Sequence, residues 1–231
     1  MPLAIDLFCG LGGWTEGLLA EGYEVVGFDI ERHQYGAHRY PAQLIVQDVL
    51  TLHGSQFRDA TLIVASPPCQ EYSYMAMPWK LAKAKAEAIR ADSTGQMLAD
   101  LNRLFDACFR IQAQASLAAG RHIPMVVENV RGAIPWVGRS RWNFGSFHLW
   151  GDVPALMPFG SIKKLKGRDT HAWEKGQKHC GNWSTLAFRG THDSSAGFDR
   201  RLASAMIAKI PLPLSRHIAA TYRRNIAYNT T

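Results

Sequence analysis

The stretch DLFCGLGGW, residues 6–14, joins an apolar run to a helical pattern through three glycines. Gly10, Gly12 and Gly13 stand where a buried strand would turn into a helix. Glycine tolerates backbone conformations that other residues avoid, and it lets the backbone approach a ligand closely. Such a turn is typical of the first βα unit of a nucleotide-binding sheet, although a tight turn without a ligand explains the glycines equally well.

Outward from this turn, strand and helix patterns alternate. The predicted strands are PLAIDLF (2–8), YEVVGFDI (23–30), QLIVQDV (43–49), ATLIVAS (60–66) and HIPMVVEN (122–129). Helices are predicted over residues 32–41, 95–119, 199–211 and 214–228, and GSFHLW (145–150) is a candidate further strand. Repeated βα units favour an α/β fold with a mostly parallel, doubly wound sheet.

Composition and charge narrow the function classes. The 231 residues are 47% hydrophobic and suit one domain. No apolar run reaches the ~20 residues needed to cross a bilayer, and no signal peptide is evident. The four scattered cysteines form no CxxC pair, which favours a reduced intracellular protein. Residues 151–231 hold 13 basic and 5 acidic side chains, whereas residues 1–150 are nearly balanced, so the last third is the candidate polyanion-binding part.

Chemistry-bearing side chains follow several predicted strands. Asp29 and Asp48 close the second and third strands, where a carboxylate can bind a ribose or simply cap a helix. The loop SPPCQEYS (66–73) follows the fourth strand, and its two prolines hold Cys69 on a stiff, non-helical support. Glu128 ends the fifth strand. Because parallel strands end at one edge of a sheet, we expect Cys69 and Glu128 to lie near each other, as covalent catalysis would require.

The ordered series DLFCGLGG, FDIE, QDV, PPCQEYS and ENVRG resembles the motifs of the DNA (cytosine-5) methyltransferases, over roughly residues 3–150. This resemblance implies a Rossmann-like fold that binds S-adenosyl-L-methionine as methyl donor. It places the following residues at the cofactor: Asp6, Phe8, Gly10, Leu11, Gly12, Gly13, Asp29, Ile30, Asp48, Val49 and Pro68. Phe8 and Ile30 would flank the adenine, and Asp29 would hold the ribose hydroxyls. The run 102–105 resembles a further cofactor-facing motif.

The resemblance also implies the catalytic residues. Cys69 would attack C6 of a cytosine flipped out of the duplex, and Glu128 would stabilise the ring, so that C5 can accept the methyl group. Residues 71–91 resemble a loop that closes over DNA, although a solvated amphipathic helix is the alternative. Gln70 or Ser73 is expected to help hold the extruded nucleotide.

Some segments depart from the family pattern. The expected arginine motif is replaced by VGRSR, in which Arg141 is the candidate for base or phosphate contact and a surface arginine pair is the alternative. The final cofactor motif is replaced by IPLPLSRHIAA, where Ser215 is the candidate substitute. We therefore divide the chain into a catalytic domain (1–150), a short basic target-recognition insert (151–195) and returning helices (196–231).

So short an irregular insert predicts a short or relaxed recognition sequence of two to four base pairs. Four of its side chains could be imagined as zinc ligands, but their spacing matches no common zinc motif, and we expect no metal: His171, His179, Cys180 and His192.

The expected partner is double-stranded DNA, and a cognate restriction enzyme is a further partner to test. We expect a monomer in the cytoplasm of a bacterial or phage-infected cell. Minimal enzymes of this kind resemble those of bacteriophages. The open alternatives are a tRNA cytosine-5 methyltransferase, a catalytically idle DNA-binding protein on the same scaffold, and a Rossmann oxidoreductase, which the glycine spacing disfavours.

Overall fold

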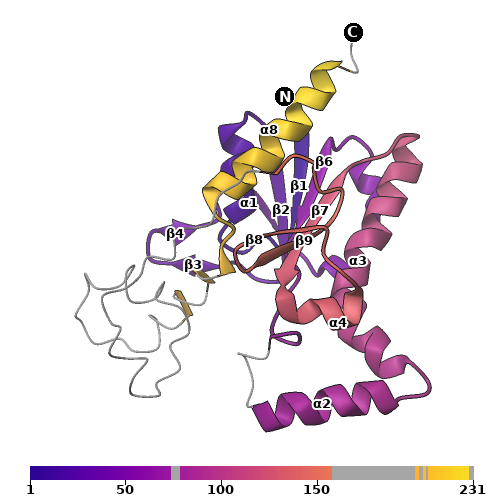
Figure 1. Cartoon of the computed structure of the whole chain (residues 1–231). Coiled ribbons are helices and arrows are strands. Elements are labelled where there is room, and N and C mark those ends of the chain that lie inside the picture. The colour runs from indigo at the N-terminus through magenta and orange to yellow at the C-terminus, as the bar shows by residue number, and fades with distance from the viewer. Residues whose placement is uncertain (74–78, 158–200, 203–204, 207, 229–231) are drawn as a thin grey trace.

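A seven-stranded sheet in the order β5-β2-β1-β6-β7-β9-β8 forms the centre of the computed structural model (Figure 1). The structure describes residues 1–73, 79–157, 201–202, 205–206 and 208–228. The strands of the sheet are β1 (Leu3–Leu7), β2 (Glu24–Asp29), β5 (Gln43–Val46), β6 (Leu62–Ala65), β7 (Met125–Val130), β8 (Trp142–Phe144) and β9 (Phe147–Gly151). The first five are parallel, which confirms the predicted α/β, mostly parallel sheet. The strand predicted over 145–150 is β9, and it pairs antiparallel to β7.

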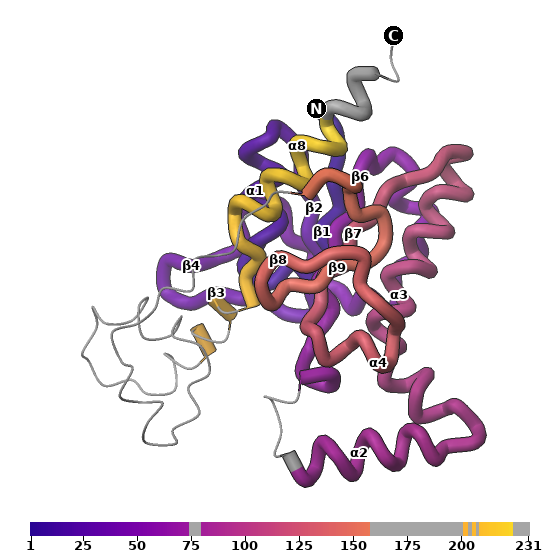
Figure 2. The backbone as a smooth tube through the Cα atoms, in the orientation of Figure 1, coloured from indigo at the N-terminus to yellow at the C-terminus, as the bar shows by residue number. Residues whose placement is uncertain are grey.

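Helices cover both faces of the sheet, because residues along each buried strand alternate between two hydrophobic clusters. On one face, α1 (Gly13–Ala20) lies beside α8 (Leu212–Tyr228), although their sequences are far apart (Figure 2). On the other face, α3 (Gln96–Ala119) packs with the short helices η1 (Val49–Thr51) and η2 (Gly54–Phe57).

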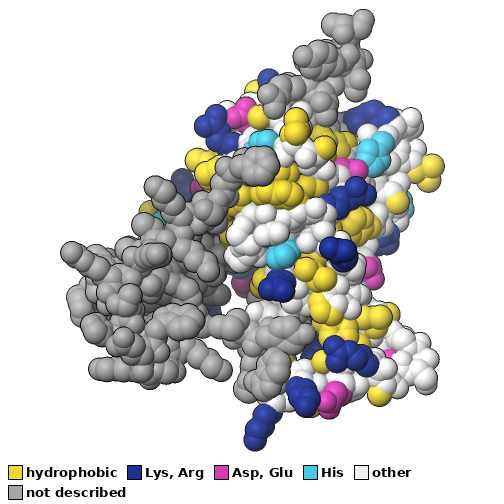
Figure 3. Space-filling view, in the orientation of Figure 1, with side chains coloured by type: hydrophobic (Ala, Val, Ile, Leu, Met, Phe, Trp, Pro, Cys, Tyr) yellow, Lys and Arg dark blue, Asp and Glu magenta, His cyan; other side chains and the backbone are white. Residues whose placement is uncertain are grey.

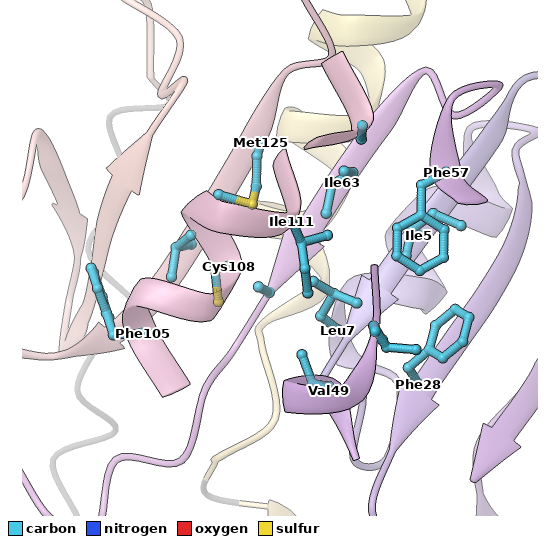
Figure 4. Packing of buried hydrophobic residues seen from close by; sticks show 14 of the residues in the cluster. Ile5, Leu7, Phe28, Val49, Phe57, Ile63, Phe105, Cys108, Ile111 and Met125 are labelled. Carbon is cyan, nitrogen blue, oxygen red and sulfur yellow. The ribbon is translucent and has the colours of Figure 1, made fainter. Parts of the chain in front are cut away.

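The two clusters meet at the sheet itself. In β1, Ile5 and Leu7 belong to the cluster under α3, and Ala4 belongs to the cluster under α1 and α8. Figure 4 shows Ile111 and Cys108 of α3 beside the strand residues of the first cluster. Fully burying such a side chain contributes about 1.5–3 kcal/mol, so the two layers hold the strand ends in fixed positions.

The helix predicted over residues 32–41 is wrong. The segment is a two-stranded antiparallel hairpin of β3 (Gln34–Tyr35) and β4 (His38–Arg39). Gly36, at a φ of 59°, occupies the left-handed region that a tight turn needs and that interrupts a helix. Pro41 follows the hairpin and packs against the glycine turn rather than ending a helix.

Helical segments follow both the loop that carries Cys69 and the strand that carries Glu128. Helix α2 (Trp79–Ala91) forms the second part of the segment 71–91 and is amphipathic, because Ala82, Ala86 and Ile89 are buried. After β7 come η3 (Arg131–Ala133) and α4 (Ile134–Val137). Of the C-terminal helices, α8 confirms the second. The insert 151–195, with its four zinc-ligand candidates, lies almost wholly outside the described residues.

Candidate active site

The carboxyl ends of the five parallel strands bring the predicted site residues to one edge of the sheet. Asp6 of β1 pairs with Gly27 of β2 on one side and with Val64 of β6 on the other. The glycine turn therefore lies between Asp29, at the end of β2, and the loop that carries Cys69. Ligands of open α/β sheets bind at this edge, so the fold places the predicted cofactor and catalytic residues where such a site is expected.

The glycine turn and Asp29 form a cradle of backbone donors and a carboxylate. The Gly10 amide donates to Asp29 Oδ2 at 2.8 Å, and the Ile30 amide donates to Oδ1 at 2.8 Å. Burial opposes ionisation of Asp29, but hydrogen bonds from His33 and Gly10 outweigh it, so its pKa lies below the ordinary value. The Asp29 carboxylate is therefore charged at neutral pH and available to hydroxyl donors.

Glycine is needed at the three positions of the turn for different reasons. A Cβ on Gly10, whose φ is 50°, would meet nothing within 4 Å, so this face of the turn is open. A Cβ on Gly12 would lie 2.5 Å from Pro41, and one on Gly13 would lie 2.4 Å from the Ile210 amide nitrogen. Gly10 alone faces free space, whereas Gly12 and Gly13 allow close packing. Phe8 is the one non-glycine residue of the described chain with a positive φ, 57°.

Beneath the turn, Asp6 ends a buried hydrogen-bond chain. Thr15 Oγ1 donates to Asp6 Oδ2 at 2.6 Å and accepts from the Tyr40 hydroxyl at 2.6 Å. Asp6 is 0% exposed, and its Oδ1 has no hydrogen-bond partner among the described residues. Burial raises the pKa of Asp6 to about 8, so it holds a proton at neutral pH. Asp6 therefore has one buried oxygen that is available for a further hydrogen bond.

The remaining cofactor candidates lie in different surroundings. Ile30 is 69% exposed at the sheet edge, and Pro68 is also exposed. Leu11 is buried, and Val49 belongs to the hydrophobic core under α3 rather than to the open edge. Asp48 caps η1, where its Oδ1 accepts from the Leu50 amide at 2.9 Å, so the helix-cap role is filled.

Cys69 stands on a loop held by backbone contacts. Asn129 Nδ2 donates to the Pro67 carbonyl at 2.9 Å, which ties the loop to the end of β7. The Cys69 carbonyl accepts from the Tyr72 and Ser73 amides, at 3.0 and 2.9 Å. Cys69 is partly exposed, whereas Cys9 and Cys108 are buried. The rigid support expected from the two prolines is thus completed by a short turn.

Glu128 is buried beside this loop. It lies within β7 and is 8% exposed. Burial raises the pKa of Glu128 to about 8, and a hydrogen bond from Ser66 acts in the opposite direction. Burial also raises the pKa of the Cys69 thiol, and the charge of Glu128 raises it further. The two groups are therefore close enough to interact, as expected from their strands.

Sequence reasoning missed several residues that hold the pair. Trp14 Nε1 donates to Ser66 Oγ at 3.0 Å, which leaves the Ser66 hydroxyl hydrogen free to point to Glu128. Asn102 of α3, expected to face the cofactor, instead bonds to Tyr72 and Trp136. An indole or an amide at such positions has no local sequence signature, because the partners lie in other elements.

Arg141 and Ser215 do not join the Cys69–Glu128 pair. Arg141 is exposed just before β8, and β9 separates β8 from β7, so Arg141 lies two strands away from Glu128. The Ser215 hydroxyl donates to the Leu212 carbonyl at 3.2 Å, and its Oγ would lie 2.3 Å from a Cβ on Gly17 of α1. Ser215 thus packs where α1 crosses α8, away from the open face of Gly10.

Basic side chains accompany α2. Lys80, Lys83 and Arg90 are exposed, and Figure 3 shows lysine and arginine side chains over the part of the surface that α2 forms. Among the described residues no cluster of three or more histidine, cysteine or acidic side chains could hold a metal ion. In the same part of the chain, no helix combines the length and the apolar character that a membrane span requires.

The topology and the residues at its carboxyl edge define a Rossmann-like α/β protein. Residues 3–104 match the family described as C-5 cytosine-specific DNA methylase. The resemblance expected from the motifs is thus matched over the segment that carries the glycine turn and Cys69. No curated protein matches the chain.

Solved structures of methyltransferases are also similar. One is an E. coli prophage-encoded protein described as a DNA modification methyltransferase, at 21% identity and a TM-score of 0.38, covering 58% of this chain and 33% of that one. The S. pombe Dnmt2 methyltransferase has 16% identity and a TM-score of 0.36, and the match covers 58% of this chain and 36% of that one. A Spodoptera frugiperda DNMT2 mutant has 17% identity and a TM-score of 0.35, and the match covers 57% of this chain and 36% of that one. The match spans about a third of each of these proteins, and at such TM-scores it carries no conclusion about function.

Proposed function

We propose that the protein transfers the methyl group of S-adenosyl-L-methionine to C5 of cytosine in double-stranded DNA. The observation that carries the proposal is the placement of Cys69 and Glu128, two interacting groups with perturbed pKa values, beside the cradle of Gly10 and Asp29. Perturbed ionisable groups at the ligand-binding edge of a sheet are typical of catalytic sites.

The residues present fit the cofactor. Gly10 leaves open space where a Cβ would stand, Asp29 keeps a carboxylate for ribose hydroxyls, and the unpartnered Oδ1 of Asp6 lies below. Ile30 offers an exposed apolar surface for a planar base. When bound, S-adenosyl-L-methionine supplies an electrophilic methyl group on a sulfonium centre.

The side chains of this protein activate the cytosine. The Cys69 thiolate adds to C6, and C5 becomes nucleophilic as electron density moves through the ring. Glu128, protonated below a pKa of about 8, donates to N3 and stabilises the charge that develops there. After methylation at C5, a base removes the C5 proton and the Cys69 sulfur leaves as thiolate. Attack perpendicular to the ring requires the base to leave the stacked duplex.

Tritiated S-adenosyl-L-methionine tests the proposal with DNA and RNA as separate substrates. We expect label in DNA from wild type and none from Cys69→Ser, since a hydroxyl is far less nucleophilic than a thiolate. Cys108→Ser is the matched control, because this buried thiol only bonds weakly to the Leu104 carbonyl, which a serine hydroxyl can replace. Label in RNA alone would assign the tRNA-type alternative, and equal labelling by Cys69→Ser would remove Cys69 from the mechanism.

The sequence specificity is a separate proposal. We infer that a short or relaxed site of two to four base pairs is recognised, because the basic insert that follows the catalytic segment is short. Bisulfite sequencing of methylated DNA measures the site directly. A site of six or more base pairs contradicts this expectation without affecting the catalytic assignment.

A further inference from the structure

The loop that carries Cys69 is anchored on α3 through the side chain of Tyr72. Tyr72 is 4% exposed, and its hydroxyl donates to Asn102 Oδ1 at 3.0 Å, with the Leu101 carbonyl a second acceptor at 3.2 Å. The Tyr72 amide itself donates to the Cys69 carbonyl. A shift of the Tyr72 ring therefore moves the backbone of the nucleophile.

The same Asn102 amide also holds the segment that follows Glu128. Asn102 Nδ2 donates at 2.9 Å to the carbonyl of Trp136 in α4, which η3 connects directly to β7. Asn102 is 8% exposed, so neither bond competes freely with water. One side chain thus connects the loop after Cys69 to the loop after Glu128.

Packing reinforces this connection. A Cβ on Gly132, in η3, would lie 2.1 Å from the Tyr72 carbonyl oxygen, so the two loops are in direct contact there. The Arg90 guanidinium lies 5.3 Å from the centre of the Trp136 ring, and Lys85 pairs with Glu71 beside Tyr72. Helix α2 therefore contacts both loops at the point where Asn102 joins them.

We propose that Tyr72 and Asn102 are positioning residues that set the distance between the Cys69 sulfur and the Glu128 carboxyl. The inference rests on the proposed function and deepens it, because both residues act on the proposed catalytic pair through the loops that follow Cys69 and Glu128. A misplacement of about 1 Å can reduce a rate by roughly 100-fold, so a hydrogen bond that holds two catalytic loops in register affects turnover more than binding.

The test compares Tyr72→Phe with Tyr23→Phe in the full chain. Both variants remove one buried tyrosine hydroxyl, and among the described residues that of Tyr23 donates to the Ala219 carbonyl of α8 at 3.1 Å. The first readout is covalent capture of a duplex oligonucleotide containing 5-fluorocytosine, with its rate measured at saturating cofactor. The second is amide hydrogen exchange at Tyr72 and Ser73, which requires no substrate.

We expect Tyr72→Phe to slow capture by about tenfold to 100-fold and to speed exchange at both amides, with cofactor KM unchanged. Asn102→Asp keeps the acceptor for Tyr72 and loses the donor to Trp136, so it should also slow capture. Tyr23→Phe should lower Tm to a similar extent and leave capture at the wild-type rate.

Two results overturn the inference: unchanged exchange at Tyr72 and Ser73 in Tyr72→Phe, or faster exchange with capture at the wild-type rate. Failure of the proposed function gives a different result, since wild type itself would then capture neither DNA nor RNA. In that case the exchange data still decide whether Tyr72 holds the loop.

Discussion

At the scale of single residues, the charge of Glu128 affects the ionisation of Cys69. The Glu128 charge disfavours the Cys69 thiolate, whereas a protonated Glu128 does not. Because burial raises the pKa of Glu128 to about 8, the carboxyl is mostly neutral at pH 7. Near neutral pH Glu128 can therefore act as a proton donor, and it adds no charge that would disfavour the Cys69 thiolate, whose pKa burial still raises.

Replacing Glu128 by glutamine should separate thiol reactivity from methyl transfer. Above pH 8 the wild-type carboxylate is charged, so its removal lowers the pKa of Cys69 and speeds alkylation by iodoacetamide. Below about pH 7 Glu128 is already neutral, and the two proteins should react at similar rates. Below pH 8 methyl transfer should fall by about 100-fold or more, because the protonated donor is lost.

Alkylation is followed by mass spectrometry of the peptide that contains Cys69. Cys108, buried in the core, serves as the internal control in the same digest. Alkylation that is faster below pH 7 but unchanged above pH 8 would contradict the assigned order of ionisation.

At the scale of elements, the strand–turn–helix unit of β1 and α1 combines ligand binding with packing. Gly10 faces open space, and Gly13 is pressed against the backbone of the segment that leads into α8. The same glycine-rich motif therefore contains one position for function and another for stability, which its sequence spacing does not distinguish.

Alanine at each of these glycines should separate the two roles. Gly13→Ala places a Cβ 2.4 Å from the Ile210 nitrogen, and we expect a loss of about 1–3 kcal/mol in unfolding free energy from overpacking. Gly10→Ala meets no neighbour but must adopt a φ of 50°, which costs roughly 1–2 kcal/mol, and its methyl group enters the cradle.

Urea unfolding measures the first effect, and calorimetric titration with S-adenosyl-L-methionine measures the second. The weakening of cofactor binding should be larger in Gly10→Ala than in Gly13→Ala. Equal affinities in the two variants would place the cofactor away from the open face of the turn.

At the scale of the whole molecule, two buried carboxyls make stability depend on pH. Asp6 and Glu128 have pKa values raised by burial to about 8, whereas an unfolded chain ionises them near their ordinary values. Their neutral forms stabilise the fold fully below pH 4, and this contribution is lost as the pH rises towards 8. The charged form of Asp29 stabilises the fold instead, because its pKa is lowered. That contribution is lost only as the pH falls below the ordinary pKa of 3.8.

Asp6→Asn should flatten this dependence, because an amide does not ionise. Between pH 5 and pH 8 the wild-type unfolding free energy should fall by roughly 1.4 kcal/mol per pH unit more than that of the variant. Urea unfolding at a series of pH values measures both slopes, whatever the absolute stability of the variant. Parallel profiles would show that Asp6 is ionised in the folded protein.

The sequence alone determined the parallel strands, the edge at which they end and the residues that follow them, because hydrophobic alternation and glycine spacing are local patterns. It was wrong for residues 32–41, where Gly36 supports a turn that a periodicity argument does not weigh.

Only the tertiary structure decided which side chains hold the site together. Trp14 reaches Ser66 across 52 residues, and Tyr72 reaches Asn102 across 30. The packing of Gly13 on Ile210 likewise depends on how α8 returns to α1. Such contacts depend on the relative placement of whole elements in three dimensions, and the local order of residues does not encode that placement.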